Sequence, residues 1–79
     1  LIKTLYYMNK KNKIKIVVNG KLLTVKTKFS VKNLIEKLKI PINKVAIELN
    51  EEIVNKKKIN KIFLKNNDKI EIVNFIGGG

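Results

Sequence analysis

The sequence contains neither cysteine nor histidine. Without cysteine the chain has no disulfide bonds and no thiolate metal ligands, and without histidine it lacks the commonest general base and metal ligand. These absences exclude serine–histidine triads, cysteine–histidine pairs and histidine-based metal sites. The chain has 79 residues, which suits a single domain whose stability must come from apolar packing and a hydrogen-bonded sheet.

Arginine is absent as well. All 18 basic residues are lysine, against 6 acidic residues, and the formal net charge is +12. Such a charge is typical of proteins that bind nucleic acid or anionic membranes, but a dedicated nucleic-acid reader is expected to use some arginine. Because lysine, asparagine and isoleucine share A/T-rich codons, we favour genome composition as the origin of the charge. No specific nucleic acid is predicted as a partner, although salt-sensitive, non-specific binding stays open.

No apolar run approaches the ~18 residues that a membrane-spanning helix needs, and no membrane partner is predicted. The N-terminal segment "LIKTLYYM" is too short for a secretory signal with its cleavage site. We therefore expect a cytoplasmic protein, with the plastid stroma as an alternative. Residues 1–12 are interpreted as an N-terminal leader of uncertain status, residues 13–76 as the folded domain, and residues 77–79 as a flexible glycine tail.

The first half of the domain begins with a predicted β-hairpin. Residues 13–18 show the alternation of a half-buried strand. Asn19-Gly20 is the strongest short signal for a hairpin turn, because a type I′ turn needs positive φ at both central residues. The return strand covers residues 21–26, with Leu23 and Val25 pointing inward.

A short amphipathic helix is predicted next. Its apolar residues follow the helical spacing i, i+3, i+4 and i+7; they are Val31, Leu34, Ile35 and Leu38. Ser30 suits the N-cap, because its hydroxyl can accept a hydrogen bond from a first-turn amide, and Pro41 prevents continuation of the helix. A helix this short must pack on another element.

The second half of the domain is predicted to contain further strands with irregular segments between them. The predicted strands cover residues 45–49 and 69–76, with a turn at 50–52 and a short apolar pair at 53–54. The lysine run 56–58 is interpreted as a solvated loop, residues 59–64 as one irregular helical turn, and residues 67–68 as a turn. Phe29 and Phe63 are expected in the core or at its edge.

This order of elements predicts an α+β protein with the ubiquitin-like β-grasp fold. The first two strands form an antiparallel hairpin, and a right-handed crossover through the helix brings a later strand alongside the first in parallel. The expected architecture is a mixed four- to five-stranded sheet with one helix packed on one face. The fold by itself assigns no function.

The remaining chemistry offers no catalytic site within the chain. The one adjacent acidic pair, Glu51-Glu52, falls in the predicted turn, whereas paired carboxylates need an enclosing cleft to separate their pKa values. The aromatic residues do not interleave with the lysines as a stacking platform would require. We therefore predict that the chain is not an enzyme, holds no metal and binds no cofactor.

Three of the four glycines occupy positions 77–79, directly after the last predicted strand. Glycine lacks a Cβ, so such a segment can take almost any backbone conformation and can enter a narrow channel. The carboxylate of Gly79 is then a reachable nucleophile. Its attack on the α-phosphate of ATP would give an acyl-adenylate, which a sulfur or amine nucleophile could displace.

Four segments carry a family resemblance: "IVVNGK" at 16–21, "VKNLIEKLKI" at 31–40, "VAIELNEEIV" at 45–54 and "NDKIEIVNFIGGG" at 67–79. Their order and spacing resemble the ThiS family of sulfur carrier proteins over about residues 13–79. The first two segments are generic to the β-grasp fold. The combination of the last two is more specific.

The resemblance implies a mechanism and its partners. An E1-like enzyme of the ThiF type consumes ATP to adenylate Gly79, a sulfur donor converts the adenylate to a thiocarboxylate, and thiazole synthase of the ThiG type takes the sulfur for thiamine biosynthesis. By the same resemblance Gly77 and Gly78 form the tail that enters the partner's active site. Phe75 and Ile76 are candidate partner contacts, with ordinary strand packing as their alternative role.

Other readings stay open beside this one. A small subunit of molybdopterin synthase shares the fold and the Gly-Gly ending, and a protein-conjugating ubiquitin-like modifier is a weaker variant. A small basic RNA-binding β-grasp module is favoured by the charge and needs no free terminus.

Overall fold

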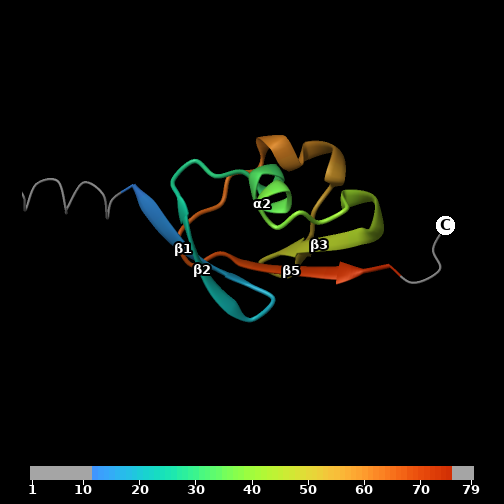
Figure 1. The fold of residues 1–79 in the computed structure, drawn as a ribbon, viewed down its shortest axis with the longest axis horizontal. Coiled ribbons are helices and arrows are strands. Elements are labelled where there is room, and N and C mark those ends of the chain that lie inside the picture. The colour runs from blue at the N-terminus through green and yellow to red at the C-terminus, as the bar shows by residue number, and fades with distance from the viewer. Residues whose placement is uncertain (1–11, 76–79) are drawn as a thin grey trace, which may run out of the picture.

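Five strands form one mixed sheet in the computed structural model, which describes residues 12–75 (Figure 1). The strands are β1 (Lys13–Val18), β2 (Lys21–Lys26), β3 (Val45–Leu49), β4 (Glu52–Ile53) and β5 (Lys69–Asn74). Their order is β2-β1-β5-β3-β4. β1 and β5 are parallel, and the other neighbours pair antiparallel. The predicted α+β, β-grasp architecture is confirmed, with five strands.

The hairpin between β1 and β2 forms at Asn19-Gly20, as predicted. Both residues have positive φ, 48° and 81°, which is the type I′ geometry. Asn19 also contacts a distant strand: its Oδ1 accepts from the Ile72 N–H at 2.7 Å, and its Nδ2 donates to the Ile72 carbonyl at 3.1 Å. The side-chain amide therefore extends the parallel pairing of β1 and β5 beyond the end of β1.

The helix α2 (Val31–Lys37) begins at Ser30, as predicted. The Ser30 hydroxyl accepts from the Asn33 N–H, and the Asn33 side chain accepts from the Ser30 N–H, each at 3.0 Å. This reciprocal arrangement is a capping box with asparagine in the third position. Val31, Leu34 and Ile35 are buried on the helix face toward the sheet.

The predicted apolar stripe was wrong at Leu38, which is the C-cap and is 38% exposed. The helix ends there because Lys39 takes the left-handed conformation, with φ of 56°. The Lys39 N–H donates to the Glu36 carbonyl and the Ile40 N–H to the Ile35 carbonyl, both at 3.1 Å. These two bonds are the Schellman motif, which usually places glycine where Lys39 stands.

Lys39→Gly is expected to raise the free energy of unfolding by roughly 0.5–1 kcal/mol, since relief of the left-handed strain exceeds the added backbone entropy of glycine. Urea denaturation followed by circular dichroism measures the change. Lys37→Gly is the matched control, because Lys37 lies within the helix; it should lower stability by about 1 kcal/mol. A loss of stability in both variants would contradict the assignment of strain to Lys39.

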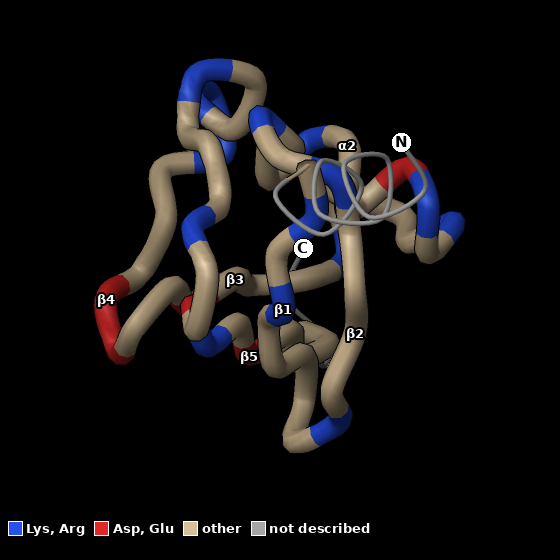
Figure 2. Tube along the Cα trace, turned by 90° about the vertical axis from the view of Figure 1, so that its left-hand side faces the viewer, with Lys and Arg blue, Asp and Glu red and all other residues tan. Residues whose placement is uncertain are grey.

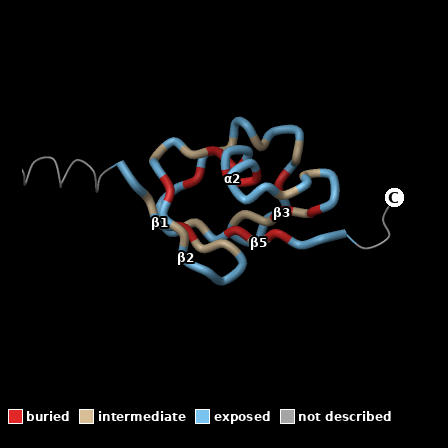
Figure 3. Tube along the Cα trace, in the orientation of Figure 1, coloured by how far each residue is buried: buried red, intermediate tan, exposed pale blue. Residues whose placement is uncertain are grey.

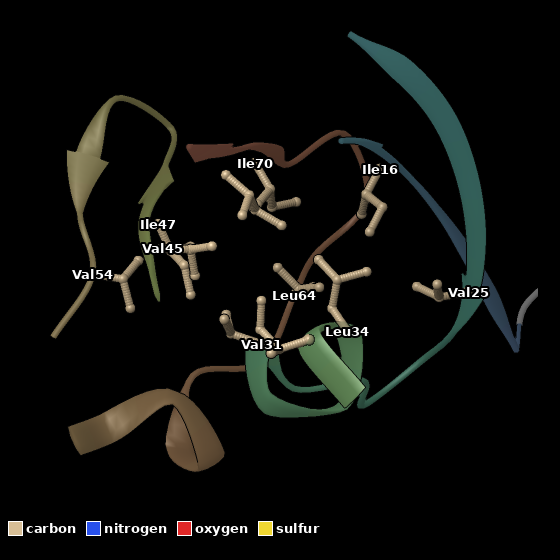
Figure 4. Packing of buried hydrophobic residues seen from close by; sticks show 11 residues of the cluster. Ile16, Val25, Val31, Leu34, Val45, Ile47, Val54, Leu64 and Ile70 are labelled. Carbon is tan, nitrogen blue, oxygen red and sulfur yellow. The ribbon is translucent and has the colours of Figure 1, made fainter. Parts of the chain in front are cut away.

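The core lies between the sheet and the layer that contains α2 (Figure 3). Val31 and Leu34 of α2 point toward Ile16 and Ile70 of the sheet (Figure 4). The buried cluster comprises Ile16, Val25, Val31, Leu34, Ile35, Val45, Ile47, Val54, Leu64, Ile70 and Ile72. The inward residues of the four longer strands, β1, β2, β3 and β5, recur with period two, as the sequence predicts.

The lysine run 56–58 is not a solvated loop. It opens the 3₁₀ helix η2 (Lys56–Lys61), so the predicted helical turn at 59–64 lies too far along the chain. Asn55 caps η2, because its Oδ1 accepts from the Lys57 N–H at 2.9 Å. A second 3₁₀ helix, η1 (Ile42–Lys44), leads into β3.

Phe63 is 54% exposed, which corrects its predicted place in or beside the core. The backbone around it is extended and forms an isolated bridge with Ser30. In extended backbone alternate side chains point to opposite faces, so Leu64, 4% exposed, turns inward and Phe63 outward. Phe29 packs against the core while partly exposed, as predicted.

The described part of the chain, residues 12–75, holds no helix with the length and apolar character of a membrane span. Residues 1–11, most of the predicted leader, lie outside the described residues, as do Ile76 and the predicted glycine tail.

Candidate functional site

The last strand ends at Asn74, which pairs with Val45 at the start of β3. This corrects the predicted strand 69–76, although backbone pairing continues for one residue. The Phe75 N–H donates to the Lys44 carbonyl at 2.8 Å. The chain is therefore held against the η1–β3 junction up to Phe75, the last described residue before the segment that contains Gly77, Gly78 and Gly79.

Phe75 is 53% exposed. Its ring lies against a lysine: the Lys56 Nζ is 4.8 Å from the ring centroid. This distance is within the range of a cation–π contact. Half of the Phe75 surface is accessible to a partner, and its predicted role in partner binding stays a prediction, as does that of Ile76.

Lys56 makes two further contacts at the same place. Its Nζ donates to the Ile42 carbonyl at 3.1 Å and to the Val45 carbonyl at 2.7 Å. Sequence reasoning missed this residue, because three consecutive lysines offer no local difference among themselves. The one available signal was Asn55, a good cap residue, which marks the start of η2 and hence the position of Lys56.

The sheet face opposite α2 carries exposed apolar side chains. Leu22, 68% exposed, stands beside Val17 on the neighbouring strand, and Val73, 52% exposed, stands beside Ala46. Ile53 of β4 is 79% exposed. Apolar surface that the domain itself does not cover is typical of protein–protein contact.

Acidic residues gather around the β3–β4 turn (Figure 2). Glu48 and Glu71 are direct partners across β3 and β5, and like charges in that arrangement are mildly destabilising. Glu51 and Glu52 are both exposed, as predicted, but Glu52 begins β4, so the turn ends one residue earlier than the predicted range 50–52. Among residues 12–75, no group of three or more acidic side chains is arranged to hold a metal ion. This corner instead gives the basic domain one local acidic surface.

One ion pair joins this corner to a lysine. The Lys69 Nζ lies 3.9 Å from Glu71 Oε1, with both side chains about half exposed at 54% and 41%. Exposed pairs of this kind contribute little to stability. Its effect here is to compensate part of the repulsion between Glu71 and Glu48.

A shallow cavity has a volume of about 380 Å³. Its lining residues come from the start of β1, the end of β2 and the segment through α2, at the end of the molecule away from the end of β5 (Figure 1). Its lining consists of Lys13, Thr24, Val25, Lys26, Phe29 and Lys37. The three lysines offer positive charge to a polyanion. The half-buried Phe29, however, is not the exposed stacking platform that single-stranded nucleic acid requires, so this cavity does not favour RNA recognition.

Comparison with known proteins places these features in a family. The ThiS family model matches residues 16–79. A thiazole synthase of Paramagnetospirillum magneticum (strain ATCC 700264 / AMB-1) is 39% identical over 66 residues, which are 84% of this chain and 20% of that protein. The uncharacterized protein ycf40 of Trieres chinensis is 54% identical over 35 residues, 44% of this chain and 48% of that one. The chain thus spans about a fifth and about half of these curated relatives.

Two solved structures have the same fold. The crystal structure of a thiamine biosynthesis protein (ThiS) from Geobacter metallireducens superposes with a TM-score of 0.75 at 32% identity, covering 84% of this chain and all of that one, 100%. An NMR solution structure of a thiamine biosynthesis protein from the same organism gives a TM-score of 0.65 at 32% identity, with 84% and 88% covered. Identities at this level support a family relationship as well as a shared fold.

Proposed function

Because the chain belongs to the ThiS family, we propose that it is a sulfur carrier protein of thiamine biosynthesis, which donates sulfur to the formation of the thiazole. The carboxylate of Gly79 becomes activated and then carries the sulfur. Gly77 and Gly78 form the arm that enters the partner's active site. The observation that supports this most is the continuity of the family match through β5 and Phe75 into the three glycines.

The chemistry proceeds in two displacements. The Gly79 carboxylate attacks the α-phosphate of ATP, which forms an acyl-adenylate and releases pyrophosphate. A sulfide then attacks the acyl carbon and releases AMP, leaving a thiocarboxylate. The chain supplies the acyl group, while ATP and the catalytic groups belong to the activating partner, an E1-like enzyme of the ThiF type. The absence of histidine and cysteine agrees with this division.

Thiazole synthase of the ThiG type is the proposed receiver of the sulfur. In the Paramagnetospirillum protein the segment similar to this chain lies within a thiazole synthase polypeptide. Joining a carrier to the enzyme that uses it raises the effective concentration of one for the other. This arrangement supports a pairing of the same two components in the present case.

Phe75 and Ile76 are proposed as the partner contacts nearest the glycine arm. Exposed Leu22 and Val73 on the open sheet face add apolar surface that the same partner can contact. The acidic corner around Glu48 and Glu71 suits a basic patch on a partner, since complementary charge steers association.

The proposal is tested by incubating the chain with ATP, a ThiF-type enzyme and sulfide, followed by intact-protein mass spectrometry. One C-terminal oxygen should be replaced by sulfur, and the mass should rise by the difference between the two elements. Omission of ATP is the control and should leave the mass unchanged. An unchanged mass in the complete mixture contradicts the sulfur carrier function. Transfer of the sulfur to ThiG-type rather than molybdopterin synthase then separates the two carrier classes.

A further inference from the structure

We propose that Lys56 is a positioning residue, which fixes the end of β5 and thereby sets the direction in which the chain leaves the domain toward Gly79. The inference rests on the proposed carrier function for its purpose, but its geometry is independent of that function. The contacts of one side chain, and their relation to Phe75, carry it.

The ammonium group of Lys56 joins two elements. Asn55 caps η2 and places Lys56 at its first position. From there the Nζ reaches the carbonyls of Ile42 and Val45, at 3.1 and 2.7 Å. These carbonyls flank the last two residues of η1, so Lys56 ties η2 to the turn that precedes β3. Hydrogen bonds from a charged donor are stronger than neutral ones.

The same turn holds the end of β5. The Lys44 carbonyl, between the two that Lys56 binds, accepts from the Phe75 N–H at 2.8 Å. The Phe75 ring lies over the Lys56 Nζ at 4.8 Å. Both the backbone and the side chain of Phe75 are therefore restrained, one indirectly through the turn and one directly, by a single lysine.

The restraint on Phe75 acts where the chain leaves the folded domain, and this position gives it a functional role. Beyond Phe75 the sequence offers one side chain with a Cβ, Ile76, and then glycines, which restrict φ and ψ least. Four residues reach at most about 14 Å when extended. Because the glycines impose little direction of their own, Phe75, the last described residue, is where the folded domain can restrain the course of the chain before this segment.

Charge alone does not account for the role of Lys56. Lys57 and Lys58 carry the same charge on the same 3₁₀ helix and are exposed, whereas Lys56 is partly buried. Lys57→Gln therefore removes one charge without removing the contacts to η1 and Phe75. It is the matched control for Lys56→Gln.

The first experiment measures amide hydrogen exchange by ¹⁵N NMR. In Lys56→Gln the Phe75 amide should exchange about five to ten times faster, the factor expected for loss of a net hydrogen-bond contribution, while the central amide of Ile47 keeps its rate. Lys57→Gln should match the wild type at both amides. Lys56→Arg, which keeps a cation and its donors, should restore most of the protection of Phe75.

The second experiment measures steady-state adenylation by the ThiF-type enzyme. Lys56→Gln should lower kcat about tenfold with a smaller change in the KM for the carrier, because an interaction that acts in the reacting complex is lost while the side chains of the docking surface, Phe75, Leu22 and Val73, all remain present. Lys57→Gln should keep the wild-type kcat, and Lys56→Arg should recover it.

The two measurements separate the possible failures. Equal Phe75 exchange in the two glutamine variants overturns the proposal, and so does faster exchange with an unchanged kcat. If the wild-type chain itself is not adenylated, the carrier function fails, and the exchange data still decide whether Lys56 restrains Phe75. Faster exchange at Ile47 as well as Phe75 would indicate general destabilisation and count against a positioning role.

Discussion

Deletion of Gly78 and Gly79 is expected to abolish formation of the thiocarboxylate, while the free energy of unfolding stays unchanged. The deletion moves the terminal carboxylate back to Gly77, nearer the domain by about 7 Å of extended chain. A carboxylate that cannot reach the α-phosphate cannot attack it, since the reacting atoms must approach to about 3–3.5 Å. The folded core, from Ile16 to Ile72, makes no contribution to that reach.

Intact-protein mass after incubation with ATP, a ThiF-type enzyme and sulfide measures the outcome. Gly78→Ala is the matched control, because it keeps the length and the carboxylate and adds only a Cβ. It should slow the reaction without abolishing it, since alanine is more restricted than glycine in a narrow channel. A sulfur-dependent mass increase in the truncated chain would refute the assignment of Gly79.

Leu34→Ala is expected to lower the free energy of unfolding by about 2–5 kcal/mol, the cost of removing buried methyl groups and leaving a cavity. Leu34 is 0% exposed and points from α2 into the core between the helix and the sheet (Figure 4). Small domains have a total stability of only about 5–15 kcal/mol. The variant should therefore be largely unfolded at moderate temperature or in low urea.

Urea denaturation followed by circular dichroism checks this expectation. Leu22→Ala makes the same chemical change on the open sheet face, where Leu22 is 68% exposed, and should alter stability by about 0.5 kcal/mol or less. Similar losses in both variants would mean that the core is not where the structure places it. Reduced partner binding by Leu22→Ala, with stability intact, would support the open face as a docking surface.

Local sequence signals account well for the hairpin and the helix start. The positive φ values of Asn19 and Gly20 follow from residue types that tolerate the left-handed region, glycine because it lacks a Cβ. The Ser30 cap follows from a hydroxyl next to free amides. The end of the helix was less predictable. Lys39 occupies a position that favours glycine, and the chain accepts the strain because neighbouring hydrogen bonds are satisfied.

The asparagines show a second limit of prediction from the sequence. In the sequence their abundance suggests codon bias, yet several make structural hydrogen bonds. Asn50 donates to Asp68 Oδ1 and accepts from the Lys69 N–H, both at 2.9 Å, and Asn66 accepts from the Lys15 N–H at 2.8 Å. Composition does not distinguish a bonded asparagine from a solvated one, because the partner lies on another element.

The sequence alone determined the chemical inventory, the hairpin, the start of the helix and the inward faces of the strands. Each depends on residue type or on preferences among residues a few positions apart, which act before the chain has a tertiary structure. The tertiary structure decided which of three equivalent lysines reaches η1 and Phe75, and which asparagine joins β1 to β5. It also decided that Glu48, Glu51, Glu52 and Glu71 gather at one corner. These outcomes depend on contacts between residues distant in the chain, such as Asn19 and Ile72, 53 positions apart, and such contacts exist only once the sheet has formed.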